Sequence, residues 1–140
     1  MSSSRVAAIA AVLLLSSAGP SVQAQATGDT AVRVEADKDG VQRTSVLAGS
    51  YFFKPRHIVV KARMPVELSV MKEPGITPHD FVLQAPDAGI AVDAKLSSEP
   101  TKVIFTPTRP GKYVFYCSNK LPFMASHRER GMEGVIEVIE

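Results

Sequence analysis

Four side chains in the sequence have the types and spacing of ligands for a single copper ion. Cys117 ends a strand-like run, the loop after it carries His127 and Met132, and His79 lies in an earlier loop. Two neutral imidazoles, one thiolate and one weak thioether are the donors of the trigonal sites with an axial ligand that carry single electrons on copper. Imidazoles suit both Cu(I) and Cu(II), so such a site rearranges little when an electron arrives. The spacing therefore predicts a mononuclear copper centre.

The small number of potential ligands narrows the chemistry further. One cysteine in 140 residues excludes an intramolecular disulfide, a four-cysteine zinc site and a two-cysteine binuclear copper centre. Three histidines are too few for a trinuclear copper cluster. We expect the third histidine, His57, to be a surface or packed residue of a strand and not a ligand.

The first 24 residues have the three parts of a secretory signal peptide. A short segment with one basic residue precedes ten apolar residues, and a small, polar stretch follows them. Ten apolar residues are too few for a membrane-spanning helix, which needs about 20. We expect cleavage after Ala24, a flexible lead-in over residues 25–30, a periplasmic protein and no stable membrane span. An uncleaved N-terminal anchor is the alternative.

The composition of the full chain indicates one folded domain. The sequence is 45% hydrophobic and 21% charged, with a formal net charge of +2. Because the exported part has no run of Lys or Arg, we expect no nucleic-acid partner. An unpaired cysteine outside the cytoplasm is open to oxidation. A metal ion that holds the thiolate would protect it.

Short β-branched or alternating runs, separated by Gly, Pro and Asp, fill residues 31–140 and predict a single-domain, all-β fold. We expect a hairpin with its turn at Asp37–Gly40, and an irregular stretch over residues 86–100. The spacing favours an antiparallel β-sandwich. The expected strands are residues 31–36, 41–47, 58–62, 66–71, 80–84, 102–106, 112–117 and 134–139. The residues expected in its core include Tyr51, Phe52, Phe53, Phe81, Phe105, Tyr113 and Phe115.

The chain resembles the cupredoxins over residues 50–140. The resemblance rests on the run PGKYVFYC that ends at Cys117, on His127 and the later Met-Glu-Gly at residues 132–134, and on Phe-Lys-Pro at 53–55 and His-Asp-Phe at 79–81. It implies a Greek-key β-sandwich with one type 1 copper near one end, working as a one-electron carrier. The ligands that the resemblance implies are His79, Cys117 and His127, with Met132 in the axial position.

Two features depart from the common cupredoxin pattern. Nine residues separate Cys117 from His127, a longer gap than in small blue copper proteins and closer to the copper domain of nitrite reductases. Asp80 follows the first histidine where many members have Asn, and either side chain can tie the two ligand loops together. The neighbouring glycines, Gly131 and Gly134, favour Met132 as the axial ligand. The alternatives for that position are Met124, Glu129 and Glu133.

The long ligand loop also contains a candidate partner surface. Its apolar run, Leu121, Pro122, Phe123 and Met124, either surrounds the edge of His127 as a docking patch for a redox partner or folds inward. Basic residues of the same loop are able to steer an acidic partner. We expect an electron carrier that is not an enzyme. The alternatives are copper storage, delivery or resistance with the same ligands, and a fragment of an enzyme related to nitrite reductase or a terminal oxidase.

Overall fold

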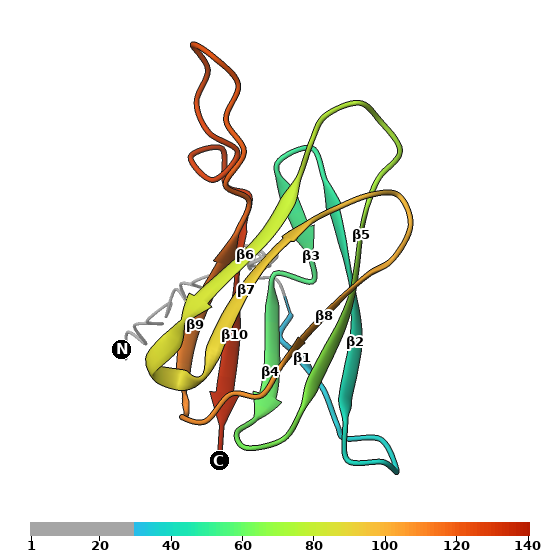
Figure 1. Ribbon diagram of the computed structural model, residues 1–140, viewed down its shortest axis with the longest axis vertical. Helices are drawn as coiled ribbons and strands as arrows, with labels where there is room; N and C mark the ends of the chain where they lie inside the picture. The colour runs from blue at the N-terminus through green and yellow to red at the C-terminus, as the bar shows by residue number, and fades with distance from the viewer. Residues whose placement is uncertain (1–29) are drawn as a thin grey trace, which may run out of the picture.

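The computed structural model describes residues 30–140, which form ten β-strands and one short 3-10 turn (Figure 1). The predicted signal peptide and all but the last residue of the lead-in lie outside the described residues. Within residues 30–140, no helix has the length and apolar character needed to cross a bilayer. The elements are β1 (Val32–Arg33), β2 (Gln42–Gly49), β3 (Phe52–Lys54), β4 (His57–Lys61), β5 (Val66–Lys72), β6 (Asp80–Ala85), η1 (Pro86–Ala88), β7 (Ile90–Lys95), β8 (Thr101–Phe105), β9 (Gly111–Tyr116) and β10 (Glu133–Ile139).

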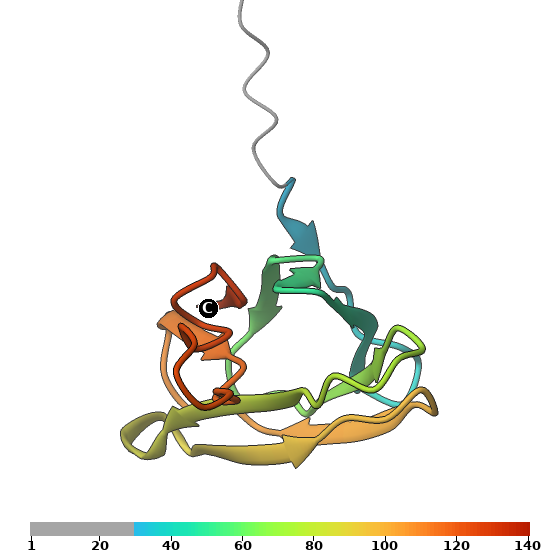
Figure 2. The ribbon, with the colours of Figure 1, turned by 90° about the horizontal axis from the view of Figure 1, so that it is seen from above.

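The strands form two sheets that enclose one core, which confirms the predicted all-β sandwich (Figure 2). One sheet has the order β1-β4-β10-β9-β6-β7, and the other has the order β3-β2-β5-β8. The sequence predicted antiparallel pairing throughout, but the structure has both parallel and antiparallel pairs. β4 is parallel to both β1 and β10, and β2 is parallel to β5. Parallel strands need a crossover connection between them. Here the chain makes that connection through the other sheet: between β1 and β4, for example, it forms β2 and β3.

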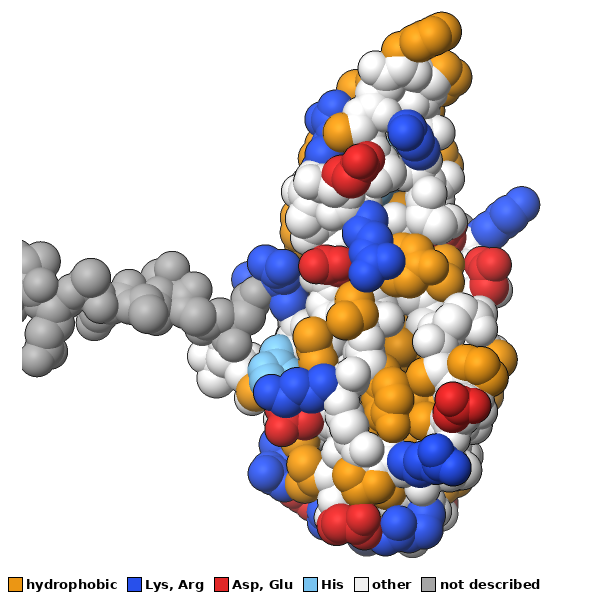
Figure 3. Space-filling view, turned by 90° about the vertical axis from the view of Figure 1, so that its left-hand side faces the viewer, with side chains coloured by type: hydrophobic (Ala, Val, Ile, Leu, Met, Phe, Trp, Pro, Cys, Tyr) orange, Lys and Arg blue, Asp and Glu red, His pale blue; other side chains and the backbone are white. Residues whose placement is uncertain are grey.

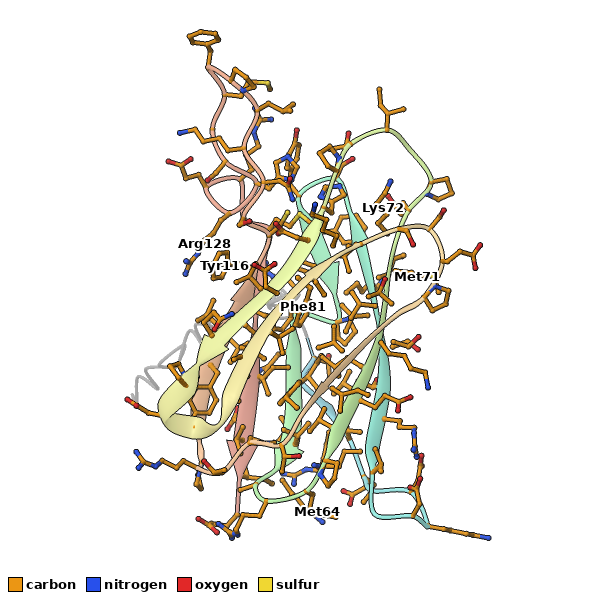
Figure 4. All side chains as sticks on the ribbon, in the orientation of Figure 1. Met64, Met71, Lys72, Phe81, Tyr116 and Arg128 are labelled. Carbon is orange, nitrogen blue, oxygen red and sulfur yellow. The ribbon has the colours of Figure 1, made fainter. Side chains whose placement is uncertain are left out.

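Alternating side chains and a cluster of aromatic rings build the core next to the site. On β5, Val66, Leu68 and Val70 are buried while the residues between them are partly exposed, as expected for a strand with one face in the core. The rings of Phe53, Phe81 and Phe115 pack together with centroid separations of 4.8–5.8 Å. Phe81 points between the sheets (Figure 4). Of the residues expected in the core, Phe53, Phe81, Phe105 and Phe115 are buried, whereas Tyr51, Phe52 and Tyr113 are half-buried.

The structure corrects one local prediction in part and another in full. The hairpin with its turn at residues 37–40 is present but short: Ala36 forms an antiparallel bridge with Gln42, and the Asp37 amide donates to the Val41 carbonyl at 2.9 Å. The expected strand before this turn does not continue along β2. The Val34 amide donates to the Val59 carbonyl at 2.9 Å, so this segment follows β4 in the other sheet. The stretch expected to be irregular contains β7, in which Ile90 and Val92 are buried and alternate with exposed residues. Its Ala, Asp and Lys residues are poor strand formers, so pairing with β6 decides its conformation.

Candidate metal centre

Three chain segments meet at one end of the larger sheet and bring the predicted ligands together. His79 directly precedes β6, Cys117 directly follows β9, and Met132 directly precedes β10. β9 pairs with β6 on one side and with β10 on the other. The neighbouring strands therefore hold these three segments side by side at the same end of the sheet (Figure 1).

The structure places one donor atom each from His79, Cys117 and His127 within 4.8 Å of one another. The two Nδ1 atoms are 3.2 Å apart, and the Cys117 Sγ lies 3.4 Å from Nδ1 of His127 and 3.8 Å from Nδ1 of His79. All three residues are buried. Both imidazoles thus face the sulfur with the same ring nitrogen, and the group could hold one copper ion.

A hydrogen bond at the base of the long loop explains how a nine-residue gap still brings His127 to Cys117. The His127 amide donates to the carbonyl of Asn119 at 2.9 Å, so residues 120–126 form an excursion that is closed where it begins. A tight turn then returns the chain to β10, and in it the Met132 amide donates to the His127 carbonyl at 3.0 Å. Gly131 has a φ of 93° in this turn, a conformation that glycine adopts at little cost.

Asp80 joins the two ligand loops in the way the sequence predicted. One carboxylate oxygen accepts the Ser118 amide at 2.6 Å, and the other accepts the Ser118 hydroxyl. The side-chain amide of Asn119 lies 3.6 Å from the Cys117 Sγ and donates to it. Sequence reasoning missed Ser118 and Asn119, and their only signal was that they directly follow the cysteine.

The surroundings of the candidate axial residues differ. Met132 is completely buried, and its carbonyl accepts the Cys117 amide at 3.1 Å. Met124 is exposed in the excursion. Glu129 accepts from the amide and hydroxyl of Ser126, and Glu133 pairs with Arg128 at 3.0 Å. Axial ligation by Met132 stays a prediction, favoured by this burial.

The remaining methionines of the described chain lie elsewhere. Met64 lies at the opposite end of the sandwich, and Met71 lies on β5 in the smaller sheet (Figure 4). Gly134, one of the two glycines that favoured Met132 as the axial ligand, lies against the aromatic cluster. A Cβ on Gly134 would lie 2.3 Å from the ring of Phe115, so this glycine makes room for the aromatic cluster.

Burial sets the charge state of the metal-free group. It is the largest cause that lowers the pKa of both His79 and His127, and it raises the pKa of the Cys117 thiol. At neutral pH the imidazoles are therefore neutral and ready to donate a lone pair, whereas the thiol must lose its proton when a metal binds.

The third histidine and the apolar run lie outside this group. His57 Nε2 is 2.6 Å from a carboxylate oxygen of Glu137, consistent with the expected packed residue. Leu121, Phe123 and Met124 are exposed, so the inward-folded alternative was wrong. The His127 ring packs instead against Tyr51 in a T-shaped arrangement, with ring centroids 5.2 Å apart. Sequence reasoning did not find this long-range contact, because nothing in the local pattern around Tyr51 indicates it.

Known structures share the fold of this chain. The metal-binding domain of the Cu(I)-exporting P-type ATPase CopA from Streptococcus pneumoniae D39, solved with Cu(I), matches with a TM-score of 0.61 at 17% identity over 81% of this chain and 99% of that one. A copper-binding protein in its apo form matches with 0.58 at 25% identity over 80% and 100%. Dithionite-reduced auracyanin from Roseiflexus castenholzii matches with 0.56 at 18% identity over 70% and 97%. Comparison of the sequence with protein families and with curated proteins finds no match.

The fold and the site define a class of protein. The chain has the cupredoxin fold, and its His-Cys-His group with the adjacent buried Met132 fits a type 1 copper site. The donor chemistry supports this fit, because a thiolate selects soft metals and neutral imidazoles suit copper in both oxidation states.

Proposed function

We propose that this protein is a periplasmic one-electron carrier that holds one copper ion at His79, Cys117 and His127, with Met132 in the axial position. The observation that carries the proposal is the convergence of three buried donor atoms within 4.8 Å at the end of a cupredoxin fold. Copper, when bound, supplies a one-electron couple between Cu(I) and Cu(II). The protein transforms no bound substrate in this role, so we do not propose an enzyme.

The side chains around the group support such a role. Asp80 and Ser118 hold the two ligand loops together, and Asn119 donates to the sulfur. Tyr51 packs against His127 and keeps water from its ring. These contacts hold the donors in place, so both oxidation states would fit with little movement, which keeps the barrier to electron transfer low.

The projecting loop is the surface that we propose for docking a redox partner. Leu121 and Met124 are each 41% exposed, and Phe123 is fully exposed. Figure 3 shows hydrophobic side chains at the tip of the molecule with Lys and Arg below them. An apolar tip with basic residues beneath it suits a partner whose own contact surface is apolar with an acidic rim.

Copper storage or delivery is the second candidate. The likeness to a metal-binding domain of a Cu(I)-exporting ATPase favours it. Such a protein would use the same ligands but would hold Cu(I) without cycling. An enzyme fragment has less support, since the likeness to a nitrite reductase covers 28% of that chain.

Spectroscopy and voltammetry of the copper-loaded domain test the proposal. We expect intense thiolate-to-Cu(II) charge-transfer absorption and a reversible potential for the domain without residues 1–24. Cys117→Ala should abolish the absorption. His57→Ala is the matched control, because it removes a histidine outside the group and should leave the spectrum unchanged. Colourless binding of Cu(I) alone would refute the carrier function and favour copper handling. Fractionation of cells that express the full chain tests the periplasmic location.

A further inference from the structure

Two arginines in the turn after His127 lie over aromatic rings of the sandwich. The guanidinium carbon of Arg128 is 4.2 Å from the ring centroid of Tyr116. The guanidinium carbon of Arg130 is 4.6 Å from the ring centroid of Tyr51. Both distances are within the roughly 6 Å over which a cation is attracted to the face of an aromatic ring. Side chains therefore attach this turn to the rest of the chain, in addition to its backbone hydrogen bonds.

Arg128 contacts the neighbours of two other predicted ligands. Tyr116 ends β9 and directly precedes Cys117, whereas Glu133 begins β10 and directly follows Met132. These two neighbours are opposite each other in the antiparallel pair of β9 and β10. Nε of Arg128 donates to the Glu133 carboxylate at 3.0 Å, and Figure 4 shows Arg128 beside Tyr116 at the end of β9. One side chain thus joins the loop to the strand pair where Cys117 and Met132 leave it.

The stack on Tyr116 lies on the outer face of the larger sheet. Phe115 and Cys117, on either side of Tyr116, are buried, so the tyrosine ring points away from the core. The ion pair between Arg128 and Glu133 is about half exposed, with 47% and 41% of the two side chains accessible. An exposed ion pair alone contributes little. The ring stack is therefore an independent part of what holds Arg128 in this place.

The second stack acts on the ring of His127. The Tyr51 ring packs against this imidazole in a T-shaped arrangement, with ring centroids 5.2 Å apart. Tyr51 has a φ of 67°, a left-handed conformation that is costly for residues other than glycine. Such a conformation persists where its surroundings hold it. The stack from Arg130 is one of the contacts that keep the Tyr51 ring against the imidazole.

We propose that Arg128 and Arg130 are positioning residues that set where the turn of residues 127–132 lies relative to Cys117. They act through the turn and through the tyrosines, and not as ligands. Within the turn the Met132 amide donates to the His127 carbonyl at 3.0 Å, so a shift of the turn moves both of these residues together. The inference rests on the proposed function only in its effect on copper, because both stacks are contacts of the protein itself.

Hydrogen exchange of the reduced, metal-free protein, followed by NMR, tests the Arg128 stack. The Met132 amide exchanges when the turn opens. The loss of an exposed cation–π contact favours opening about threefold, and the loss of an exposed ion pair favours it about twofold. We therefore expect Arg128→Gln to speed exchange of the Met132 amide about sixfold. Arg128→Lys keeps the charge without the planar fork and should have a smaller effect, which makes it the second variant if Arg128→Gln does not fold.

Variants of the ring separate the stack from the ion pair. In the Tyr116→Leu background, Arg128→Gln should speed exchange only about twofold, because the ion pair alone is left to lose. In the Tyr116→Phe background the full effect should return, since the ring is kept. An unchanged Met132 exchange rate in Arg128→Gln, or the same effect in the Leu background as in the wild type, would overturn the proposal.

The Arg130 stack has its own test and the chain offers a matched control for both. Arg130→Gln should speed exchange of the His127 amide about threefold in the wild type and not in a Tyr51→Leu background. Arg43→Gln is the control, because it also removes a partly exposed, ion-paired guanidinium. Arg43 lies near the start of β2, whereas Tyr51 follows the end of that strand. The control should leave exchange in the turn unchanged.

The copper-loaded protein separates this inference from the proposed function. Arg128→Gln and Arg130→Gln should change the charge-transfer spectrum and the Cu(II) hyperfine splitting, and Arg43→Gln should not. Faster exchange with unchanged spectra would show a contribution to stability alone and would overturn the positioning role. If the protein binds no copper but exchange follows the stacks, the proposed function fails and the two stacks still hold the turn. If copper binds and cycles but the variants alter neither exchange nor spectra, the positioning role fails alone.

Discussion

Removing the carboxylate that joins the two ligand loops should cost a large part of the stability of the metal-free domain. Asp80 is buried and accepts two hydrogen bonds from Ser118, one from the amide and one from the hydroxyl. Hydrogen bonds to a charged group contribute about 1.5–3 kcal/mol each. Asp80→Ala removes both and leaves the Ser118 donors without this acceptor, so we expect the free energy of unfolding to fall by about 3 kcal/mol or more.

A set of variants separates this contact from general effects of losing an acidic residue. Asp80→Asn keeps an oxygen that accepts the Ser118 amide and should cost about 1 kcal/mol. Ser118→Ala removes the hydroxyl bond alone and should cost about 1.5 kcal/mol. Asp93→Ala is the matched control, because it removes an exposed carboxylate from the adjacent strand β7 and should change stability by less than about 0.5 kcal/mol.

Urea unfolding of the metal-free, reduced protein measures these differences, provided that the slope with denaturant stays constant. In the Ser118→Ala background, Asp80→Ala should cost about 1.5 kcal/mol less than in the wild type, because one of its two bonds is already absent. A loss below about 1 kcal/mol for Asp80→Ala, or equal losses in both backgrounds, would show that the pair does not hold the loops together.

Three further predictions concern the loaded site. Burial raises the pKa of the Cys117 thiol, so at pH 7.5 metal binding should release about one proton, and affinity should rise about tenfold per pH unit below that pKa. Calorimetry in buffers of different ionisation enthalpy measures this release, and a value near zero would contradict it. Met132→Leu should raise the potential by tens of millivolts without loss of copper, since it removes a weak donor to Cu(II) and 59 mV corresponds to a tenfold change. Loss of all the copper would show that Met132 is needed to hold it. Asn119→Leu should lower the potential by a similar amount, because the sulfur loses a hydrogen bond and becomes a stronger donor. An unchanged potential and absorption band would refute that contact.

The parts of the fold that local patterns determine could be predicted from the sequence. β5 and β10 have clear alternation, and their positions agree with the expected strands within a residue. The pairing partners could not be predicted, because they depend on which edges are free after the other strands have paired. Residues 31–36 illustrate this point, since the turn after them closes a hairpin only at Ala36 and Gln42, whereas β1 pairs with β4 and the Val34 amide donates to the Val59 carbonyl.

The candidate site also has residues that the sequence indicated and contacts that it did not. Residue type and position relative to the strands indicated His79, Cys117 and His127, and the structure brings these three together. The cover of His127 by Tyr51 and the donation from Asn119 to the sulfur depend on tertiary contacts. No periodicity or motif encodes these contacts, so they are evident only in the folded chain.

The closed base of the ligand loop also explains why its length does not have to disturb the site. A flexible loop of nine residues between Cys117 and His127 would leave the histidine free to occupy many positions, and fixing it would cost entropy each time a metal bound. The hydrogen bond from the His127 amide to Asn119 and the turn that follows hold the histidine through contacts of the protein itself. The excursion beyond this bond is then free to vary in length and sequence without moving a donor atom. A protein built in this way can change the exposed tip of this loop while the geometry around the sulfur stays the same.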